Sequence, residues 1–167
     1  HADTPRSPMI ASRSAWLRHL RHRFAINWHG VHGVSHWTRV RRYGLVLAKA
    51  TGANITVVEL FAFFHDSCRV NEFQDHDHGK RGAELAVKLR GRLFEATDPE
   101  MDLLVEACTG HTEGRVEGHV TVQTCWDADR LDLARAGQTP RPERLCTEAA
   151  RDPQTLQWAV ARSLQGA

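Results

Sequence analysis

The chain has 167 residues, 41% of them hydrophobic, and 22 basic residues against 20 acidic ones. This is enough for one domain with a buried core, and the near-even charge gives no reason to expect nucleic acid or an anionic membrane as a partner. No apolar run reaches the roughly 20 residues that span a bilayer, and the first residues lack the apolar stretch of a signal peptide. We therefore expect a cytoplasmic protein without a membrane partner, either a monomer or a homodimer.

The start of the chain and the spacing of the cysteines predict the domain boundaries and the redox state of the thiols. Residues 1–8 are interpreted as a disordered tail or a vector-derived remnant, because the chain starts on His1 and Met9 is a candidate native start. The single domain then covers residues 9–167. Four widely spaced cysteines form no CxxC pair, so reduced thiols are expected rather than a zinc finger or a disulfide framework. The unusual feature of the composition is its 11 histidines.

Helical patterns dominate the first half of the chain. Residues 9–28 mix apolar and basic residues at helical spacing, and a glycine-punctuated connection follows. Asn54 stands where it can cap a helix over about 55–66. Between these segments, one face of a further helix carries His36, Val40, Tyr43, Leu47 and Ala50.

The second half of the chain continues the helical pattern. Residues 80–91 predict a short helix, a second helix capped at Thr97 or Asp98 runs to His111, and residues 119–137 predict the last strong helix. A proline-rich connection and a terminal helical segment follow. The only strand-like stretch, "VTV", is too short to carry a sheet. The sequence therefore predicts an all-α single domain, a bundle of about six to eight helices.

Histidines and aspartates recur on the apolar faces of these predicted helices. His36, His65 and Asp129 each lie on the apolar stripe of a different helix. Nitrogen and oxygen donors that converge in a core need a partner that compensates their charge, and a divalent cation does so. Asp66 lies about 100° round the helix from His65 and can approach the same ion. Two imidazoles and two carboxylates suit Mn, Fe, Co, Ni, Mg or Zn.

Periodicity alone does not fix the last ligand. Asp127 also shares a helical row with apolar residues, namely Val120, Leu131 and Ala134. Two aspartates two positions apart point about 200° from each other on a helix, so they cannot both face one ion. From the pattern, either Asp127 or Asp129 is the candidate.

The order of these residues resembles the HD-domain metal-dependent phosphohydrolases, in particular the small bacterial HD hydrolases. The likeness rests on "HWTRV" with His36, "FHD" with His65 and Asp66, and "DADRL" with Asp129, and it covers roughly residues 28–137. The final ligand of the family is the aspartate of an A-D-x-L segment, which favours Asp129. The resemblance implies an HD-type helical domain with one or two divalent metal ions per chain, hydrolysing phosphate esters or anhydrides.

The resemblance also implies roles for residues around these ligands. His78 and His111 stand where two-metal members of the family place further ligands; alternatively, His78 contacts substrate phosphate and His111 supports a ligand or ends a helix. Arg69 replaces a glutamate that some HD nucleotidases are proposed to use for proton transfer, and a cation there suits phosphate binding better, unless it is a surface ion-pair partner. The implied catalytic residues are Asp66, Arg69 and His78, and the implied substrate-binding residues are His32, Arg69, Lys80 and His111.

The predicted function is hydrolysis of a small phosphorylated substrate, a nucleotide or a phosphometabolite, by metal-activated water. Asp66 would bridge the metals or orient the water, and Arg69 and Lys80 would neutralise charge developing on the phosphate. A di-iron oxygenase on the same scaffold is a second hypothesis and would need both His78 and His111 as ligands. A non-catalytic nucleotide-binding module is a third, and the intact ligand set argues against it. The weak net charge argues against long nucleic acid as the main substrate.

Overall fold

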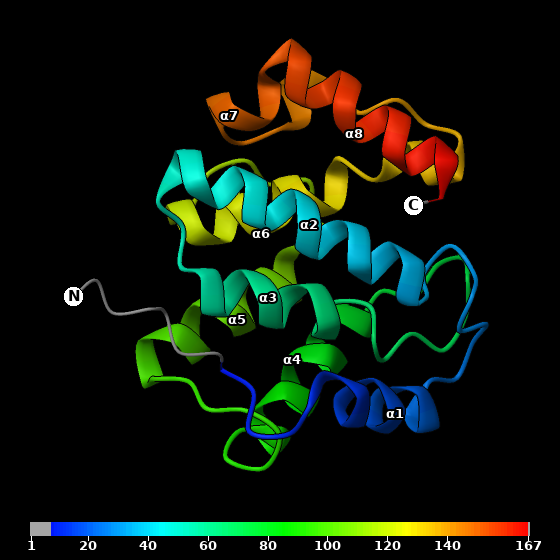
Figure 1. Ribbon diagram of the computed structural model, residues 1–167, viewed down its shortest axis with the longest axis vertical. Helices are drawn as coiled ribbons and strands as arrows, with labels where there is room; N and C mark the ends of the chain where they lie inside the picture. Colours follow the sequence, from blue (N-terminus) through cyan, green and yellow to red (C-terminus); the bar gives the residue numbers. More distant parts are fainter. Residues whose placement is uncertain (1–7, 167) are drawn as a thin grey trace.

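The computed structural model describes residues 8–166, and Figure 1 shows this part of the chain as an all-helical bundle. Residues 8–166 form eight α-helices, two short 3-10 helices and no β-strand, with two isolated bridges at Phe94. The prediction of an all-α bundle of six to eight helices is confirmed. The helices are α1 (Arg13–Arg23), α2 (Val34–Thr51), α3 (Ile55–Phe64), α4 (His78–Leu89), α5 (Asp98–Gly110), α6 (Val120–Arg130), η1 (Leu133–Ala136), η2 (Pro142–Arg144), α7 (Glu148–Arg151) and α8 (Pro153–Gln165).

The boundary between the predicted tail, residues 1–8, and the folded domain differs from the sequence prediction. Residues 1–7 of the expected tail lie outside the described residues. Pro8 belongs to the predicted tail, yet its carbonyl accepts a hydrogen bond of 2.8 Å from the backbone N–H of Glu95. Ile10 likewise donates its backbone N–H to the carbonyl of Leu93 at 2.8 Å. Pro8 is therefore part of the fold.

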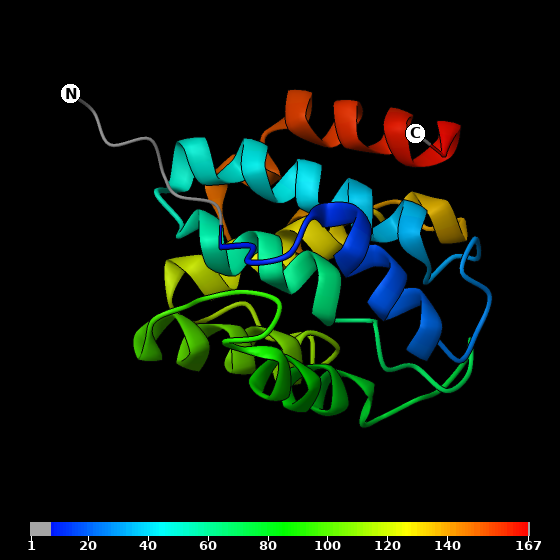
Figure 2. The same cartoon turned by 60° about the horizontal axis from the view of Figure 1, so that its bottom comes forward.

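Helix α3 lies at the centre of the bundle. Its sequence, "ITVVELFAFF", is apolar around most of its circumference, which is typical of a helix buried on several sides. Residues 60–64 are all buried, and α3 packs against α2, α4, α5 and α6 (Figures 1 and 2). The residues that follow α3 are therefore delivered into the interior of the molecule.

Helix α1 is shorter than the predicted segment 9–28. It begins after Ser12, whose side chain accepts a hydrogen bond from the backbone N–H of Ala15, and it ends at Arg23. Trp16 is fully buried, and its indole N–H donates to the carbonyl of Leu93 at 2.7 Å. The residues after Arg23 form a loop rather than a helix. In this loop Phe24 and Trp28 make edge-to-face contacts with each other and with Trp37 of α2.

The predicted helix over residues 119–137 is interrupted, which corrects the sequence prediction. Helix α6 ends at Arg130, a turn follows, and residues 133–136 form the 3-10 helix η1. The backbone N–H of Asp132 bonds to the carbonyl of Asp129 at 3.1 Å, three residues back rather than four. This tighter turn carries Asp132 into the interior, where its side chain is fully buried. Leu133, which a continuous helix would place on the apolar stripe of Asp129, lies in η1 instead. On α2, Ala50 is exposed, although the other members of its predicted stripe are buried.

Helix α4 crosses the end of α3 so closely that a side chain at Gly82 has no room. A Cβ atom at this position would fall far inside van der Waals contact of the Phe64 carbonyl oxygen. We expect Gly82→Ala to lower the free energy of unfolding by about 1–3 kcal/mol, because the two helices must separate. Glu84→Ala, an exposed change on the same helix, should stay within about 0.5 kcal/mol of the wild type. Urea unfolding measures both, and equal stabilities would contradict this packing.

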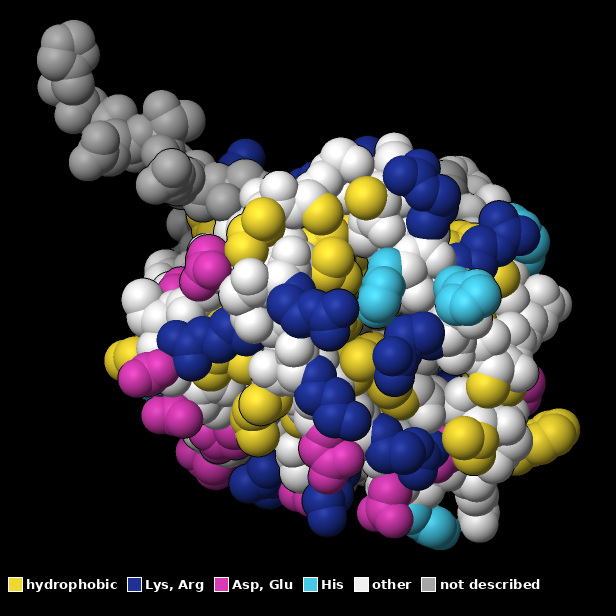
Figure 3. Space-filling model, turned by 90° about the horizontal axis from the view of Figure 1, so that it is seen from below, with side chains coloured by type: hydrophobic (Ala, Val, Ile, Leu, Met, Phe, Trp, Pro, Cys, Tyr) yellow, Lys and Arg dark blue, Asp and Glu magenta, His cyan; other side chains and the backbone are white. Residues whose placement is uncertain are grey.

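Helices α1 and α4 form the lower face of the molecule. Figure 3 shows lysine and arginine side chains in the middle of this face, interrupted by apolar side chains, with acidic side chains along part of its rim. His22 on α1 and the nearby loop residue His29 are exposed, whereas His19 is half-buried. Of the helices within residues 8–166, none combines the length and the apolar character needed to cross a membrane.

Candidate metal centre

Six side chains from five helices or their ends converge beside α3. His36 lies in the first turn of α2, and His65 caps the C-terminus of α3. His78 is the first residue of α4, and His111 caps the C-terminus of α5. The apolar run of α3 thus leads directly into the cluster. Its six members are His36, His65, Asp66, His78, His111 and Asp129.

The first group within the cluster is formed by the four ligands predicted from the sequence. The Nε2 atoms of His36 and His65 are 3.0 Å apart. Asp129 Oδ1 lies 3.1 Å from His36 Nε2 and 3.4 Å from His65 Nε2. Asp66 Oδ2 lies 3.4 Å and 3.6 Å from the same two nitrogens. Metal–ligand bonds of about 2.0–2.2 Å place neighbouring ligand atoms about 3.0–3.6 Å apart, so this spacing fits one ion.

The second group is formed by His78, His111 and the other oxygen of Asp66. The Nε2 atoms of the two histidines are 3.0 Å apart. Asp66 Oδ1 lies 3.0 Å from His78 Nε2 and 3.4 Å from His111 Nε2. Asp66 therefore presents one oxygen to each group of histidines. This is the arrangement of a carboxylate that can bridge two metal ions, and all members of this group are buried.

The hydrogen bonds of the four histidines aim their Nε2 lone pairs at the cluster. Each Nδ1–H donates away from it: His36 to Asp132, His65 to the carbonyls of residues 61 and 62, His78 to the carbonyl of residue 75, and His111 to the carbonyl of residue 108. A neutral imidazole that donates through Nδ1 carries a lone pair on Nε2. Pairs of lone pairs 3.0 Å apart repel each other unless a cation or a proton lies between them. The donor set therefore fits two divalent cations.

The ionisation of the cluster is consistent with a cation site. Burial raises the pKa of Asp66, but the nearby imidazoles outweigh burial and hold this pKa well below its ordinary value. Asp129 behaves in the same way, with burial opposed by His36 and His65. Burial lowers the pKa of His65, which favours the neutral form that binds metals. Burial also lowers the pKa of His36, but the surrounding carboxylates raise it to about 9, so a metal ion must displace a proton there.

Asp132 supports the cluster from behind and was not predicted from the sequence. Its Oδ2 accepts the His36 Nδ1–H at 2.7 Å. Its Oδ1 accepts the Nε–H of Arg39 at 2.7 Å and the hydroxyl of Ser163 on α8 at 2.5 Å. A carboxylate in this position fixes the tautomer and the orientation of a ligating imidazole. The spacing Asp129-x-x-Asp132 was the available signal, but it did not distinguish a ligand from a residue that supports one.

The positions of Asp127 and Asp129 decide which of the two aspartates is the candidate metal ligand. Asp129 reaches the cluster, whereas Asp127 faces away from it and is fully buried. Asp127 accepts hydrogen bonds from the backbone N–H groups of Cys146 and Thr147, at 2.6 and 2.9 Å, and from the Thr147 hydroxyl at 2.7 Å. It therefore holds the start of α7. Asp127 is therefore a residue that caps and anchors α7 rather than a ligand of the cluster.

A pair of amide substitutions tests this division of roles. We expect Asp129→Asn to lose bound metal, because a neutral amide is a much weaker ligand for a hard cation. Asp127→Asn should keep the metal but lower the free energy of unfolding by about 1–3 kcal/mol, because its amide cannot accept all three hydrogen bonds. Metal analysis and urea unfolding of both variants give the answer. Loss of metal from the Asp127 variant alone would reverse the assignment.

The remaining predicted residues lie at different distances from the cluster. Arg69 is close, with Nε 3.4 Å from Asp66 Oδ1, but its Nη1 donates to the carbonyls of Asn71 and Phe73. His32 is half-buried, and its Nδ1 lies 3.4 Å from Glu72 Oε2. Lys80 is exposed on α4, and among the described residues it forms no ion pair with the cluster. The structure thus places Arg69 beside the cluster and leaves Lys80 on the surface.

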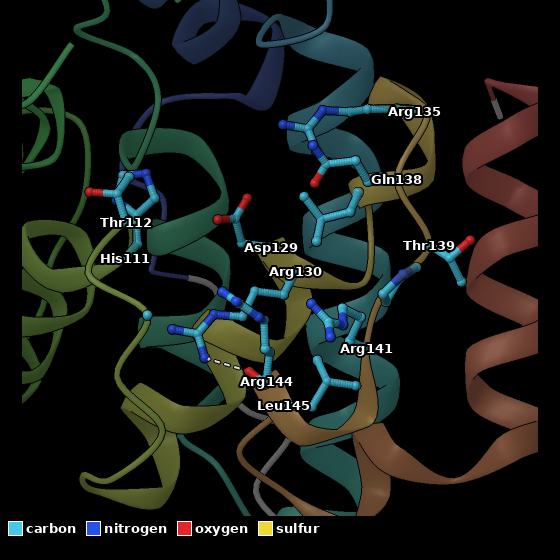
Figure 4. Close-up of a pocket in the computed structure, with 13 residues that line it drawn as sticks. His111, Thr112, Asp129, Arg130, Arg135, Gln138, Thr139, Arg141, Arg144 and Leu145 are labelled. Atoms are coloured by element: carbon cyan, nitrogen blue, oxygen red, sulfur yellow. Dashed lines mark hydrogen bonds between the residues drawn. The ribbon is translucent and has the colours of Figure 1, made fainter. Parts of the chain in front are cut away.

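A cavity of about 460 Å³ opens onto the cluster. His111 and Asp129 form its inner wall, and the side chain of Asp129, 18% exposed, is the most accessible of the cluster. The outer wall comes from the end of α6, from η1 and from the proline-rich segment 138–145 (Figure 4). Asp129 is the only acidic residue among the residues that line the cavity. Four arginines line it as well: Arg130, Arg135, Arg141 and Arg144. No motif in the sequence predicts this cavity.

Comparisons of the chain with protein-family models, with curated proteins and with solved structures find no match. The resemblance to the HD-domain phosphohydrolases therefore rests on the motifs alone. The geometry of the cluster is independent of that resemblance.

Proposed function

We propose that the chain is a metal-dependent phosphohydrolase that acts on a small phosphorylated substrate. One observation carries the proposal: a cluster of four imidazoles, with their Nε2 atoms turned toward one another in two pairs, and two carboxylates opens through Asp129 into a cavity lined by arginines. The cluster suits divalent cations. The cavity suits an anion, because guanidinium groups match phosphate oxygens in charge and geometry.

In this proposal His36, His65, Asp66 and Asp129 hold one divalent ion, and Asp66, His78 and His111 hold a second. Such ions supply Lewis acidity and lower the pKa of water. Asp66 positions both groups, because its two oxygens face different pairs of histidines. Asp132 keeps His36 in the tautomer that exposes Nε2. Arg69, 3.4 Å from Asp66, adds positive charge near the second group, where it favours an anionic transition state.

A di-iron oxygenase is the second candidate function. The observation in its favour is that both His78 and His111 join the cluster, as that chemistry requires. The arginine-lined cavity favours the phosphohydrolase, because activation of O₂ has no need for four guanidinium groups. Iron loading decides between them: an oxygenase would bind two Fe per chain, show an iron absorption band and consume O₂.

The test of the proposed function is phosphate release from a panel of nucleotides and phosphometabolites, with Mn²⁺, Mg²⁺, Co²⁺ or Ni²⁺ added in turn. We expect at least one compound to be hydrolysed about 100-fold faster than in EDTA. His65→Ala should abolish this activity, and His22→Ala, an exposed histidine on α1, should not. No turnover of any compound with any of these metals would overturn the proposal, and nucleotide binding without turnover would favour a binding module.

A further inference from the structure

The arginines of the cavity differ in how much of each guanidinium is already occupied. Arg130 is fully engaged: it donates to the carbonyls of Arg115 and Arg144 and lies over the Trp126 ring, 5.6 Å from its centroid. Arg135 donates its Nε to the carbonyl of Val31 and its Nη1 to that of Asp132, and its Nε lies 3.8 Å from Asp132 Oδ2. Within residues 8–166 only its Nη2 has no partner. These two arginines build the wall and contribute charge, but they offer few free donors.

Arg141 and Arg144 are the available cations of the cavity. Among the described residues, the side chain of Arg141 forms an ion pair with Glu143 alone, and both side chains of this pair are more than 60% exposed, so the pair is weak. The Arg144 side chain is exposed and forms no ion pair among the described residues. In Figure 4 both lie with Arg130 on one side of Asp129, and Arg135 lies on the other. Their guanidinium groups are therefore available to an anion that enters the cavity.

The segment that carries these two arginines is held rigidly. Pro140 and Pro142 flank Arg141 and fix the backbone φ angle on either side of it. The carbonyl of Arg144 accepts the Arg130 Nη1–H at 2.9 Å, and Leu145 is buried. A backbone that is fixed before binding loses little backbone entropy when a ligand binds. The main chain that carries the two arginines is therefore preorganised.

From this arrangement we infer that the cavity binds a second anionic group of the substrate, so that the substrate carries at least two phosphate groups. This inference rests on the proposed function. One phosphate lies at the metal cluster beside Asp129 and His111, and the other is bound by Arg141 and Arg144. A cavity of about 460 Å³ accepts a molecule of the size of a nucleotide or a sugar bisphosphate and encloses only a short part of a polymer.

The test compares ligands that differ by one phosphate group. Two matched pairs are titrated calorimetrically into the metal-loaded protein: AMP with ADP, and fructose 6-phosphate with fructose 1,6-bisphosphate. We expect the second member of at least one pair to bind ten times more tightly or better, because each charge-assisted hydrogen bond contributes substantially to affinity. Metal content is measured after each titration, so that extraction of metal by the ligand is detected.

The double variant Arg141→Ala/Arg144→Ala should lose this preference and bind both members of the pair alike. Its fold is expected to survive, because both side chains are exposed and the Arg130 bond uses the backbone carbonyl of residue 144. Arg141→Lys/Arg144→Lys should retain part of the preference through its charge. The matched control is Arg13→Ala/Arg18→Ala, two exposed arginines of α1, which should leave the preference unchanged.

The outcomes separate this inference from the proposed function. If phosphate is released but neither pair shows a preference, or the preference survives in the Arg141/Arg144 alanine variant, the inference is wrong and the function stands. If the arginine-dependent preference is present but no compound is hydrolysed, the proposed function is wrong and the second anion site stands.

Discussion

Asp66→Ala is expected to remove both metal ions and essentially all phosphohydrolase activity, a loss on the order of a thousandfold or more. The reason is geometric: Asp66 Oδ2 faces His36 and His65, while Oδ1 faces His78 and His111. Any other single ligand belongs to one group only. Removing this carboxylate also leaves four imidazoles close together with less negative charge among them, which weakens cation binding further.

The measurement is elemental analysis of the purified variant, together with phosphate release under the conditions that suit the wild type. Asp102→Ala is the matched control, because Asp102 is exposed on α5 and should change neither quantity. His78→Ala provides an intermediate case, since it should lose the ion of the second group and keep the first. Full metal occupancy in Asp66→Ala would show that this carboxylate does not bridge the two groups.

The second large effect is expected at Asp132, a positioning residue rather than a ligand. Asp132→Ala should weaken binding of the first ion by about 10–100-fold, because His36 loses the partner that fixes its tautomer. It should also lower the free energy of unfolding by about 3–5 kcal/mol, because the buried Arg39 loses its counter-charge. Competition with a chromophoric chelator measures the affinity, and urea unfolding measures the stability.

Two comparisons distinguish positioning from a general loss of structure. Ser163→Ala removes one hydrogen bond to Asp132 but leaves His36 and Arg39 bonded, so its metal affinity should stay close to that of the wild type. In Asp132→Ala, the ion held by His78 and His111 should remain, because that group does not contact Asp132. Equal weakening of both ions would indicate a global structural effect and would argue against the positioning role.

Much of the cluster was predictable because its members lie on apolar helical faces. His36 lies among the buried residues of α2, so the 3.6-residue period directs it inward. His65 follows α3, which is apolar on most sides, so it is delivered into the interior. Their convergence with Asp129 follows from packing three such faces into one core. For His78 and His111 the prediction left several roles open, because both occur at helix ends, where periodicity gives no direction.

The unpredicted features depend on tertiary structure. Asp132 turns inward because the helix tightens after Arg130, and one-dimensional periodicity cannot locate such a break. The arginines of the cavity come from a helix end, a 3-10 helix and a proline-rich segment, none of which has a repeating pattern. Asp127 shares an apolar row with its neighbours, but only the position of Thr147 shows that it holds the start of α7.

The most direct test of a two-metal centre is anomalous diffraction from crystals of the protein grown with Mn²⁺. Two anomalous peaks are expected on either side of Asp66, one beside the Nε2 atoms of His36 and His65 and the other beside those of His78 and His111. This expectation follows from the two pairs of imidazole Nε2 atoms, each 3.0 Å apart, which suit a cation between them. The absence of anomalous density from both positions, in crystals soaked with saturating Mn²⁺, would contradict the metal centre.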